Sequence, residues 1–241
     1  MSFLGDVWDW FTDSAQWHGT GGIPHRTFEH VQLSGITMLV AFVVAVPVGI
    51  VLGHYRRGGN AAVIVANLGR AIPSFGVLVL LVQVLGIGAK PTFVALLLLA
   101  VPPMLTNAYT GLASVDDDLR EAARGMGMTR RQMLWRVELP VASPLVMAGV
   151  RTAAVTVVAT ASLAAIVAWG GLGRFVVDGI AQGDSAQTFG GAVLIALLAI
   201  ATEVALALVQ HFVVPRPLRT GASVRRTAPD LDVAARPNVT V

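Results

Sequence analysis

Five long apolar segments restrict this chain to folds that cross a membrane. Each reaches the ~20 residues that a helix needs to cross ~30 Å of hydrocarbon, and they lie at about residues 31–53, 61–88, 91–112, 144–169 and 190–212. Hydrophobic residues make up 55% of the chain and charged residues 13%, whereas soluble domains carry about 25% charged residues. Backbone polar groups in lipid must be bonded within the spanning structure, and helices satisfy that condition. The sequence therefore predicts an all-α polytopic membrane protein with five spans.

The basic residues predict how these spans are oriented. If the N-terminus is outside, one side of the membrane holds Arg56, Arg57, Arg120, Arg124, Arg130, Arg131, Arg136, Arg216, Arg219, Arg225, Arg226 and Arg236. The opposite side then holds only Arg26, Lys90 and Arg174. Because basic loops stay in the cytoplasm, we expect an extracytoplasmic N-terminus and a cytoplasmic C-terminus in a bacterial plasma membrane. The first residues lack the basic start and cleavage site of a signal peptide, so the first span is expected to be an uncleaved anchor.

The two ends of the chain differ from the spans in composition. Residues 1–27 place tryptophans among aspartates, which predicts an amphipathic segment at the outer membrane interface, where Trp is favoured. An aromatic cage for a cation, built from Trp8, Trp10 and Trp17, is the alternative interpretation. Residues 213–241 are rich in Pro, Arg, Thr and Ala. That composition predicts a disordered cytoplasmic tail.

A charged loop, residues 114–140, separates the third span from the fourth. Ser114, with Asp117 three residues later, predicts the N-cap of a short helix. An apolar stripe with the spacing of one helical face consists of Leu119, Ala122, Ala123 and Met126, and the side chains expected to point elsewhere are those of Arg120, Glu121 and Arg124. The loop therefore begins with an amphipathic helix.

A turn and a second short helix are expected to follow. Gly125 and Gly127 supply the backbone freedom for a sharp turn. Thr129 and Gln132 form a second capping signal, and the helix is expected to run to about Val137 and to end at Leu139–Pro140. Local physics alone leaves two interpretations open, because such helices either bind a protein partner or rest on anionic lipid.

The loop also fits a longer spacing pattern. The pattern reads EAA, three residues, Gly, nine residues, an aliphatic residue, one residue and LP, and its positions are Glu121, Ala122, Ala123, Gly127, Val137, Leu139 and Pro140. It resembles the EAA loop of type I ABC importer permeases, departing only in Val137 where Ile is usual. Further stretches resemble the osmoprotectant group, which imports glycine betaine, carnitine, choline and related solutes; they are RAIPSFGVLVLLVQVLGIG at 70–88, NAYTGL at 107–112 and ELP…MAGVRTA…ATASLAA…GGLG at 138–173. The similarity covers residues 28–212 and implies the five-span permease bundle of that family, with coupling helices in the loop 114–140.

The resemblance also implies a set of partners. In that family the EAA loop sits in a cleft of a cytoplasmic ATPase, so the apolar stripe is expected to pack there, with Glu121 and Arg124 pairing at the rim and Gly127 permitting the turn. The implied partners are two ATPase subunits that use ATP and Mg²⁺, a second permease that is identical or paralogous, an extracytoplasmic solute-binding protein, a small solute and membrane lipid, with no nucleic acid. The chain has no G-x-x-x-x-G-K-[ST] sequence, and its single lysine, Lys90, lies in GIGAKP. We therefore expect no ATPase site, no cofactor and no enzymatic activity in this chain.

Polar residues within the spans are candidates for the solute pathway, and they are Arg70, Arg151, Thr152, Thr156, Thr160 and Glu203. The three charged residues lie on the order of 10–15 Å from the cytoplasmic boundary, so Glu203 is expected to pair with Arg151 or Arg70. Snorkelling of either arginine to the interface is the alternative. The three threonines share one helical face and form either a polar route for a zwitterionic solute or a packing ridge whose hydroxyls bond their own backbone.

Prolines, glycines and one outer loop complete the prediction. Pro47, Pro73 and Pro102–Pro103 interrupt the first three spans and predict kinks, while Gly49 and Gly53 predict close helix packing. In the loop between the fourth and fifth spans, Arg174 and Asp178 are four apart and suit one helical turn. That loop and residues 86–91 form the expected docking surface for the binding protein, and a plain interfacial helix is the alternative.

The leading hypothesis is therefore the permease subunit of an ATP-driven importer of quaternary ammonium osmolytes. An amino-acid or methionine importer is the nearest alternative. A proton-coupled secondary carrier that uses Glu203 is the alternative of another class, although such carriers are built from inverted repeats and none is visible here. A metal enzyme is unsupported, because the histidines lack ligand spacing and the chain has no cysteine.

Overall fold

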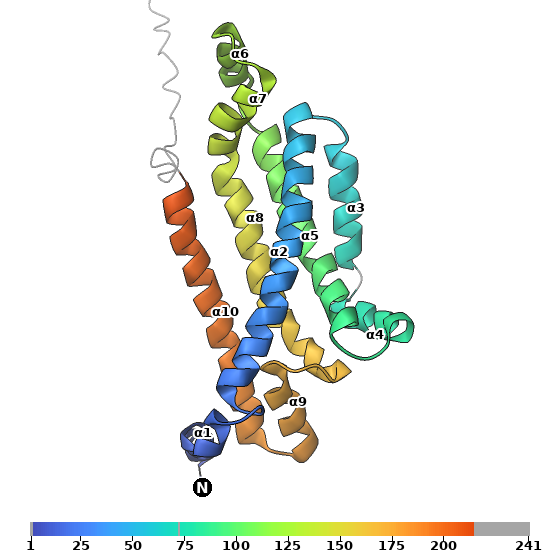
Figure 1. Ribbon diagram of the computed structural model, residues 1–241, viewed down its shortest axis with the longest axis vertical. Coiled ribbons are helices and arrows are strands. Elements are labelled where there is room, and N and C mark those ends of the chain that lie inside the picture. The colour runs from blue at the N-terminus through green and yellow to red at the C-terminus, as the bar shows by residue number, and fades with distance from the viewer. Residues whose placement is uncertain (1, 72, 215–241) are drawn as a thin grey trace, which may run out of the picture.

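The computed structural model describes residues 2–71 and 73–214, in which all regular structure is helical. Figure 1 shows long helices running side by side along the molecule. Within the described residues, four helical segments are long and apolar enough to cross a membrane. They are α2 (Ile23–Tyr55), α5 (Ala89–Ala113), the continuous stretch Arg130–Val167 that contains α8 (Leu139–Thr160), and α10 (Ser185–Val213). Four of the five predicted spans are therefore found as long helices, and the predicted tail lies outside the described residues from 215 onward.

The second predicted span, residues 61–88, is not one helix. It consists of α3 (Gly59–Ala71) and α4 (Ser74–Leu85), and Pro73 stands at the N-cap of α4. Figure 1 shows α4 turned across the direction of α3. Proline lacks the N–H that continues a helix, and it disfavours helical conformation in the residue before it. By contrast, Pro47 stays inside α2, and Pro102 and Pro103 stay inside α5.

The core is built on α5, which lies between α2 and α8. A Cβ added at Gly49 would lie 2.7 Å from Ala108 Cβ, and one at Gly149 would lie 2.7 Å from Asn107 Cβ. Glycine is therefore required on both neighbours of α5, because the backbones approach too closely for a side chain. The close packing predicted at Gly49 and Gly53 is confirmed. The buried side chains around this contact are small or aliphatic and include Ala41, Ala45, Leu96, Ala100, Met104, Ala153 and Val157.

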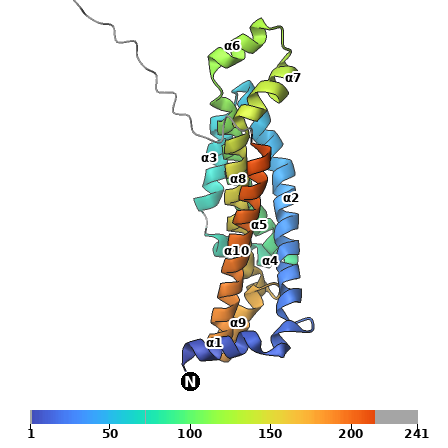
Figure 2. The ribbon, with the colours of Figure 1, turned by 90° about the vertical axis from the view of Figure 1, so that its left-hand side faces the viewer.

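One end of the bundle carries short crosswise elements. Figures 1 and 2 show α1 (Phe3–Thr12) lying across this end, beside α9 (Gly173–Gln182) and the start of α10. Trp10 is buried with its ring edge-on to Phe175 at 5.4 Å between centroids. That tryptophan therefore packs in the protein and is not free for an open cage. The predicted Arg174–Asp178 ion pair is present on α9, at 2.8 Å.

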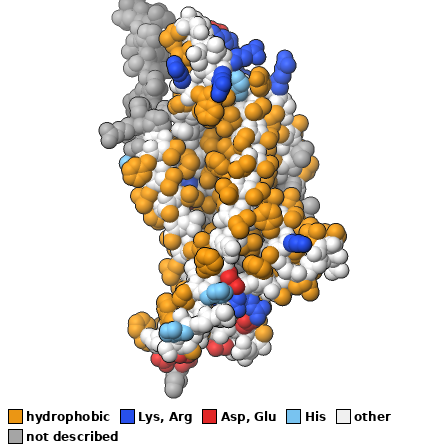
Figure 3. All heavy atoms as spheres, viewed as in Figure 1, with side chains coloured by type: hydrophobic (Ala, Val, Ile, Leu, Met, Phe, Trp, Pro, Cys, Tyr) orange, Lys and Arg blue, Asp and Glu red, His pale blue; other side chains and the backbone are white. Residues whose placement is uncertain are grey.

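The surface separates into an apolar belt and two charged ends. Figure 3 shows hydrophobic side chains along the middle of the molecule, with several basic side chains at the end that carries α6 and α7, and acidic, histidine and further basic side chains together at the opposite end. The most apolar window of α10 has no buried residue. The belt therefore presents a surface suited to lipid or to another membrane subunit rather than to water.

Candidate functional site

The loop 114–140 projects beyond the helix bundle and begins with α6 (Asp117–Gly125), as Figure 2 shows. Its N-cap is Asp116, whose carboxylate accepts a hydrogen bond from the Asp118 N–H at 3.0 Å. Ser114 is not the N-cap; its hydroxyl donates to the Gly111 carbonyl and closes the end of α5. The predicted helix is confirmed, with its start two residues later than the Ser114 cap implied.

Gly127 makes the turn that ends α6. Its φ is +77°, in the left-handed region that favours glycine. The Met128 N–H donates to the Ala123 carbonyl and the Gly127 N–H donates to the Arg124 carbonyl, which is the pair of bonds of a Schellman motif. The predicted turn is therefore confirmed at Gly127, whereas Gly125 is the last residue of the helix.

The second short helix of the loop continues without a break into the helix bundle. Thr129 and Gln132 form the predicted capping box at the start of α7 (Arg130–Met133). A π-helical turn, Leu134–Glu138, then leads directly into α8, so the predicted end at Leu139–Pro140 is wrong. The Leu139 N–H bonds five residues back to Leu134, and this wider turn accommodates Pro140, which has no N–H of its own. The loop is thereby attached to α8 as one continuous helical segment.

The apolar stripe of α6 is divided between two faces. Ala123 is buried, whereas Leu119 is 40% and Met126 is 70% exposed. Glu121, Ala122 and Arg124 are also exposed, and no ion pair joins Glu121 to Arg124 in the described part of the chain. Most of the stripe is thus available to another protein. Trp135, on the π-helical turn, adds a further exposed aromatic side chain.

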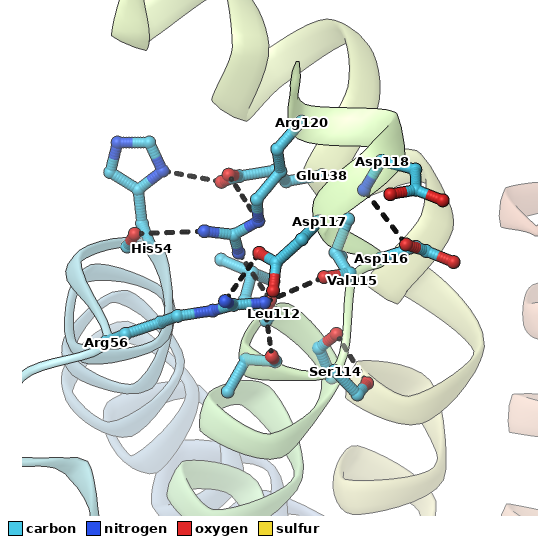
Figure 4. A network of polar contacts seen from close by, with 12 residues as sticks. His54, Arg56, Leu112, Ser114, Val115, Asp116, Asp117, Asp118, Arg120 and Glu138 are labelled. Atoms are coloured by element: carbon cyan, nitrogen blue, oxygen red, sulfur yellow. Dashed lines mark hydrogen bonds and ion pairs between the residues drawn. The ribbon is translucent and has the colours of Figure 1, made fainter. Parts of the chain in front are cut away.

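The sequence predicted that Arg120 points away from the protein. Its side chain is instead buried beneath α6. Its Nε lies 3.3 Å from Glu138 Oε1, and one of its Nη atoms donates to the Leu112 carbonyl at 2.7 Å. The other Glu138 oxygen lies 2.5 Å from His54 Nδ1. Figure 4 shows these side chains converging from α2, α6 and the π-helical turn. Burial lowers the pKa of the Arg120 guanidinium, and the carboxylate of Glu138 opposes that effect.

This buried cluster of His54, Arg120 and Glu138 fixes the loop to the bundle. An unpaired charge in such a place destabilises a protein by about 3–5 kcal/mol, so the three residues depend on one another. Sequence reasoning assigned Arg120 to the wrong face of α6 and did not single out His54 or Glu138. The available signal was Glu138 itself, an acidic residue next to the LP of the loop pattern, where a span begins.

A cavity of about 900 Å³ opens beside this cluster, and its lining is mainly basic. Arg56 pairs with Asp117 at 2.6 Å and donates to the Val115 carbonyl at 2.9 Å, as Figure 4 shows. The other lining residues are His54, Tyr55, Arg57, Arg120, Arg124, Met128, Arg130 and Met133. The lining therefore carries a net positive charge, with five arginines against one aspartate.

A second polar region lies along α8 and α10, within the apolar belt. The predicted pair of Arg151 and Glu203 is present, and Arg151 also donates to Gln210 Oε1 at 2.6 Å. A groove of about 430 Å³ is lined by Ala148, Arg151, Thr152, Val155, Thr156, Glu203 and Gln210. We call this the membrane groove. Arg70, the other predicted partner of Glu203, has a side chain that is not among those the structure describes.

The three threonines of α8 do not share one environment. Thr152 and Thr156 line the membrane groove, and the Thr156 hydroxyl bonds the Thr152 carbonyl at 2.8 Å. Thr160 instead lines a separate small pocket with Ser74 and Thr92. The hydroxyl of Thr156 thus bonds its own helix, as the packing interpretation predicts, while its side chain still borders the groove.

At the opposite end of the bundle, polar contacts fix the glycine-rich turn before α9. Glu29 accepts the Gly171 N–H at 2.8 Å and pairs with Arg26 at 2.8 Å. His30 is buried between the Val158 carbonyl, at 2.8 Å, and the Leu172 N–H, at 3.3 Å. No cluster of potential metal ligands occurs among the described residues. This end is therefore a fixed surface, and its polar groups are arranged for packing.

Comparisons with known proteins agree on one type of protein. Residues 45–219 match the family model described as "Binding-protein-dependent transport system inner membrane component". The chain is 35% identical to the choline transport system permease protein OpuBB of Bacillus subtilis, covering 81% of this chain and 90% of that protein. It is 35% identical to the glycine betaine/carnitine/choline transport system permease protein OpuCB of the same organism (83% and 92%), and 34% identical to the osmoprotectant import permease protein OsmW of Salmonella typhimurium (83% and 95%).

A solved structure has the same fold. An inward-facing form of the MetNI methionine ABC transporter aligns with a TM-score of 0.67 and 24% identity, over 78% of this chain and 94% of that chain. At this identity the similarity supports the fold alone.

Proposed function

Because the chain belongs to the family of binding-protein-dependent transport system inner membrane components, we propose that it carries osmoprotectants of the quaternary ammonium class. It is the permease subunit of an ABC importer and has no ATPase domain of its own. Three relatives at about 35% identity, with coverage above 80% of this chain, transport choline, glycine betaine, carnitine or osmoprotectants by name. That agreement is the observation that supports the substrate class.

We further propose that α6 is the element that docks on the ATPase. Glu121, Ala122 and Met126 are exposed at the far end of the loop, so a partner can contact them. Ala123 anchors the helix from beneath, and Gly127 sets the angle of the turn. Val137, Leu139 and Pro140 are half-buried at the π-helical turn that joins the loop to α8. Movement of the ATPase would then be passed to α8 through a continuous helix.

The topology that fits this role has the N-terminus outside and α6 in the cytoplasm. The basic end near α6 and α7 then meets the anionic inner surface, in accordance with the positive-inside rule. In this proposal α3 and α4 together make the remaining crossing, which gives five. The solute-binding protein docks on the opposite end, near α9, and a second permease, identical or paralogous, covers part of the apolar belt.

The two alternatives are less well supported. The methionine transporter is similar at only 24% identity, which does not extend to its substrate. A proton-coupled carrier requires no ATPase, whereas the family to which the chain belongs is part of an ATPase-driven system. Glu203 also engages Arg151, so its carboxylate already has a partner.

The proposal is tested by uptake. The chain is expressed with its ATPase and binding protein in a bacterium that lacks osmolyte uptake, and radiolabelled glycine betaine, carnitine, choline and methionine are supplied at high osmolarity. We expect ATP-dependent uptake of at least one quaternary ammonium solute and none of methionine. Uptake of methionine alone, or of no quaternary ammonium solute by an assembled complex, would contradict the substrate class.

A further inference from the structure

The membrane groove places a full ion pair deep within the apolar belt. Arg151 is twelve residues into α8, about 18 Å from the helix start at 1.5 Å per residue. Glu203 is ten residues before the end of α10, about 15 Å from it. Both groups therefore lie several turns inside the apolar helices that form the belt, away from the helix ends. Charges at that depth are costly, and they usually face a pathway or another charged group.

The groove is open on the side of this subunit. The Arg151 side chain is 28% exposed and that of Glu203 is 41% exposed. If lipid covered the groove, these polar atoms would face hydrocarbon, which strongly disfavours them. The site is thus incomplete in a single chain and requires cover from the second permease. Its volume of about 430 Å³ lies within the ~300–1,000 Å³ typical of small-molecule sites.

The lining combines opposite charges with apolar surface. Arg151 offers a guanidinium that binds carboxylates well, and Glu203 offers a carboxylate that attracts a cation. Ala148 and Val155 also line the groove and provide apolar contact, and Thr152 and Gln210 provide polar groups. A quaternary ammonium group has no N–H to donate, so it needs only the nearby negative charge and apolar contact for its methyl groups. The groove therefore presents one feature for each half of a small zwitterion.

We propose that the membrane groove is a solute site in which a zwitterion replaces the Arg151–Glu203 pair charge for charge. The solute carboxylate binds the Arg151 guanidinium, and the solute's quaternary ammonium group lies against the Glu203 carboxylate. No charge is left unpaired in the membrane at either stage, so opening the pair carries little net electrostatic penalty. Gln210 accepts from Arg151 at 2.6 Å and holds the guanidinium in place while its carboxylate partner changes.

This site discriminates between solutes that share the same cationic group. Glycine betaine and carnitine carry a carboxylate, whereas choline does not. Choline bound at Glu203 would leave Arg151 without a negative partner, and an unpaired buried charge is strongly disfavoured. The groove is therefore selective for zwitterions over choline, in addition to any selection by the binding protein. This inference rests on the proposed function, since it assumes a quaternary ammonium substrate.

The experiment compares the wild type with Arg151→Gln, Glu203→Gln and the double variant that carries both changes. The permease–ATPase complex is placed in nanodiscs without binding protein, and equilibrium binding of radiolabelled glycine betaine and choline is measured. We expect each single change to weaken betaine binding by about tenfold or more, because one charged contact is lost. Arg151→Gln should also shift preference toward choline, since no guanidinium is left unpaired.

The double variant separates a solute site from a merely structural ion pair. Removing both charges leaves no unpaired group, so the complex should assemble and melt close to the wild type. We expect it to fail in betaine binding and uptake all the same. Normal betaine uptake by the double variant would overturn the proposal.

A conservative variant keeps the test decisive if the double variant does not assemble. Glu203→Asp retains the charge and moves it back by one methylene, so it should raise the KM for betaine uptake several-fold without reducing the amount of complex. An unchanged KM would overturn the proposal. If the wild-type complex takes up no quaternary ammonium solute at all, the proposed function fails instead.

Discussion

Two ion pairs of the same chemistry occupy opposite environments in this permease. In the His54–Arg120–Glu138 cluster the side chains of Arg120 and Glu138 are 4% and 0% exposed, whereas in the membrane groove those of Arg151 and Glu203 are 28% and 41% exposed. The first pair is enclosed by α2, α6 and the π-helical turn, and although Arg120 and His54 border the neighbouring cavity, the Glu138 side chain is fully buried. The second pair is open on one side of the subunit, where a solute can replace one partner of each charge. An enclosed ion pair can hold two elements together, whereas an open ion pair can exchange its partner for a solute.

The largest expected effect is on stability, at the enclosed pair. Glu138→Gln removes the countercharge of Arg120 and should destabilise the protein by about 3–5 kcal/mol, because the guanidinium stays buried. A fall in the apparent Tm of the purified complex, followed by tryptophan fluorescence, would show this. Glu121→Gln is the matched control when both variants are also melted without the ATPase, since Glu121 is exposed on the same loop of the permease alone and the change should then leave Tm nearly the same. Equal Tm values for the two variants would show that the cluster does not fasten the loop.

The next effect concerns transport rather than stability. Gly127→Pro should reduce uptake by about tenfold or more while the protein stays in the membrane, because proline fixes φ near −65° and Gly127 requires +77°. The proline also removes the N–H that bonds the Arg124 carbonyl. Uptake and membrane abundance are measured together. Gly127→Asn is the control, since Asn tolerates left-handed backbone and should retain most uptake; normal uptake by Gly127→Pro would contradict the role of the turn.

The smallest effect is expected at an exposed ion pair of the same loop. Asp117→Asn removes the partner of Arg56, but their side chains are 69% and 39% exposed. Water screens such pairs, so stability should change by less than about 1 kcal/mol. Arg56 would still donate to the Ala113 and Val115 carbonyls. If Asp117→Asn lowers the Tm as much as Glu138→Gln does, the exposure of an ion pair does not determine how much it stabilises this protein.

The sequence predicted the features that depend on local spacing. Apolar length located four long helices, and the Thr129–Gln132 capping box and the Gly127 turn were found where expected. Similar depth left Arg151 and Arg70 as possible partners of Glu203, and the structure shows Arg151 in that place. Pro73 was expected only to kink the second span, and the sequence did not show that it would divide the span into two helices. Pro47 and Pro102–Pro103, which carry the same signal, stay inside their helices. The apolar stripe predicted α6 correctly, but the face of α6 that packs on the protein carries Arg120 and Ala123 rather than the whole stripe.

The enclosed cluster needed information that no local pattern carries. Arg120 is buried because Glu138 and His54 meet it from other elements, and an isolated amphipathic helix would expose any arginine. The π-helical turn was also not predicted, because the sequence of residues 134–138 is that of an ordinary helix. The wider turn is needed only to accommodate Pro140.

The contrast between the two pairs is tested most directly by making one substitution, Glu to Gln, at both sites and measuring two properties of each variant. Glu138→Gln should lower the Tm of the permease–ATPase complex strongly, and whatever complex remains folded should still prefer betaine over choline as the wild type does. Glu203→Gln should lower the Tm much less, because Arg151 keeps its bond to Gln210 and its side chain is 28% exposed, and it should weaken betaine binding in the groove by about tenfold or more. If both variants lose stability to the same degree and betaine binding survives in folded Glu203→Gln protein, the two pairs have the same structural role, and the assignment of the groove to solute is wrong.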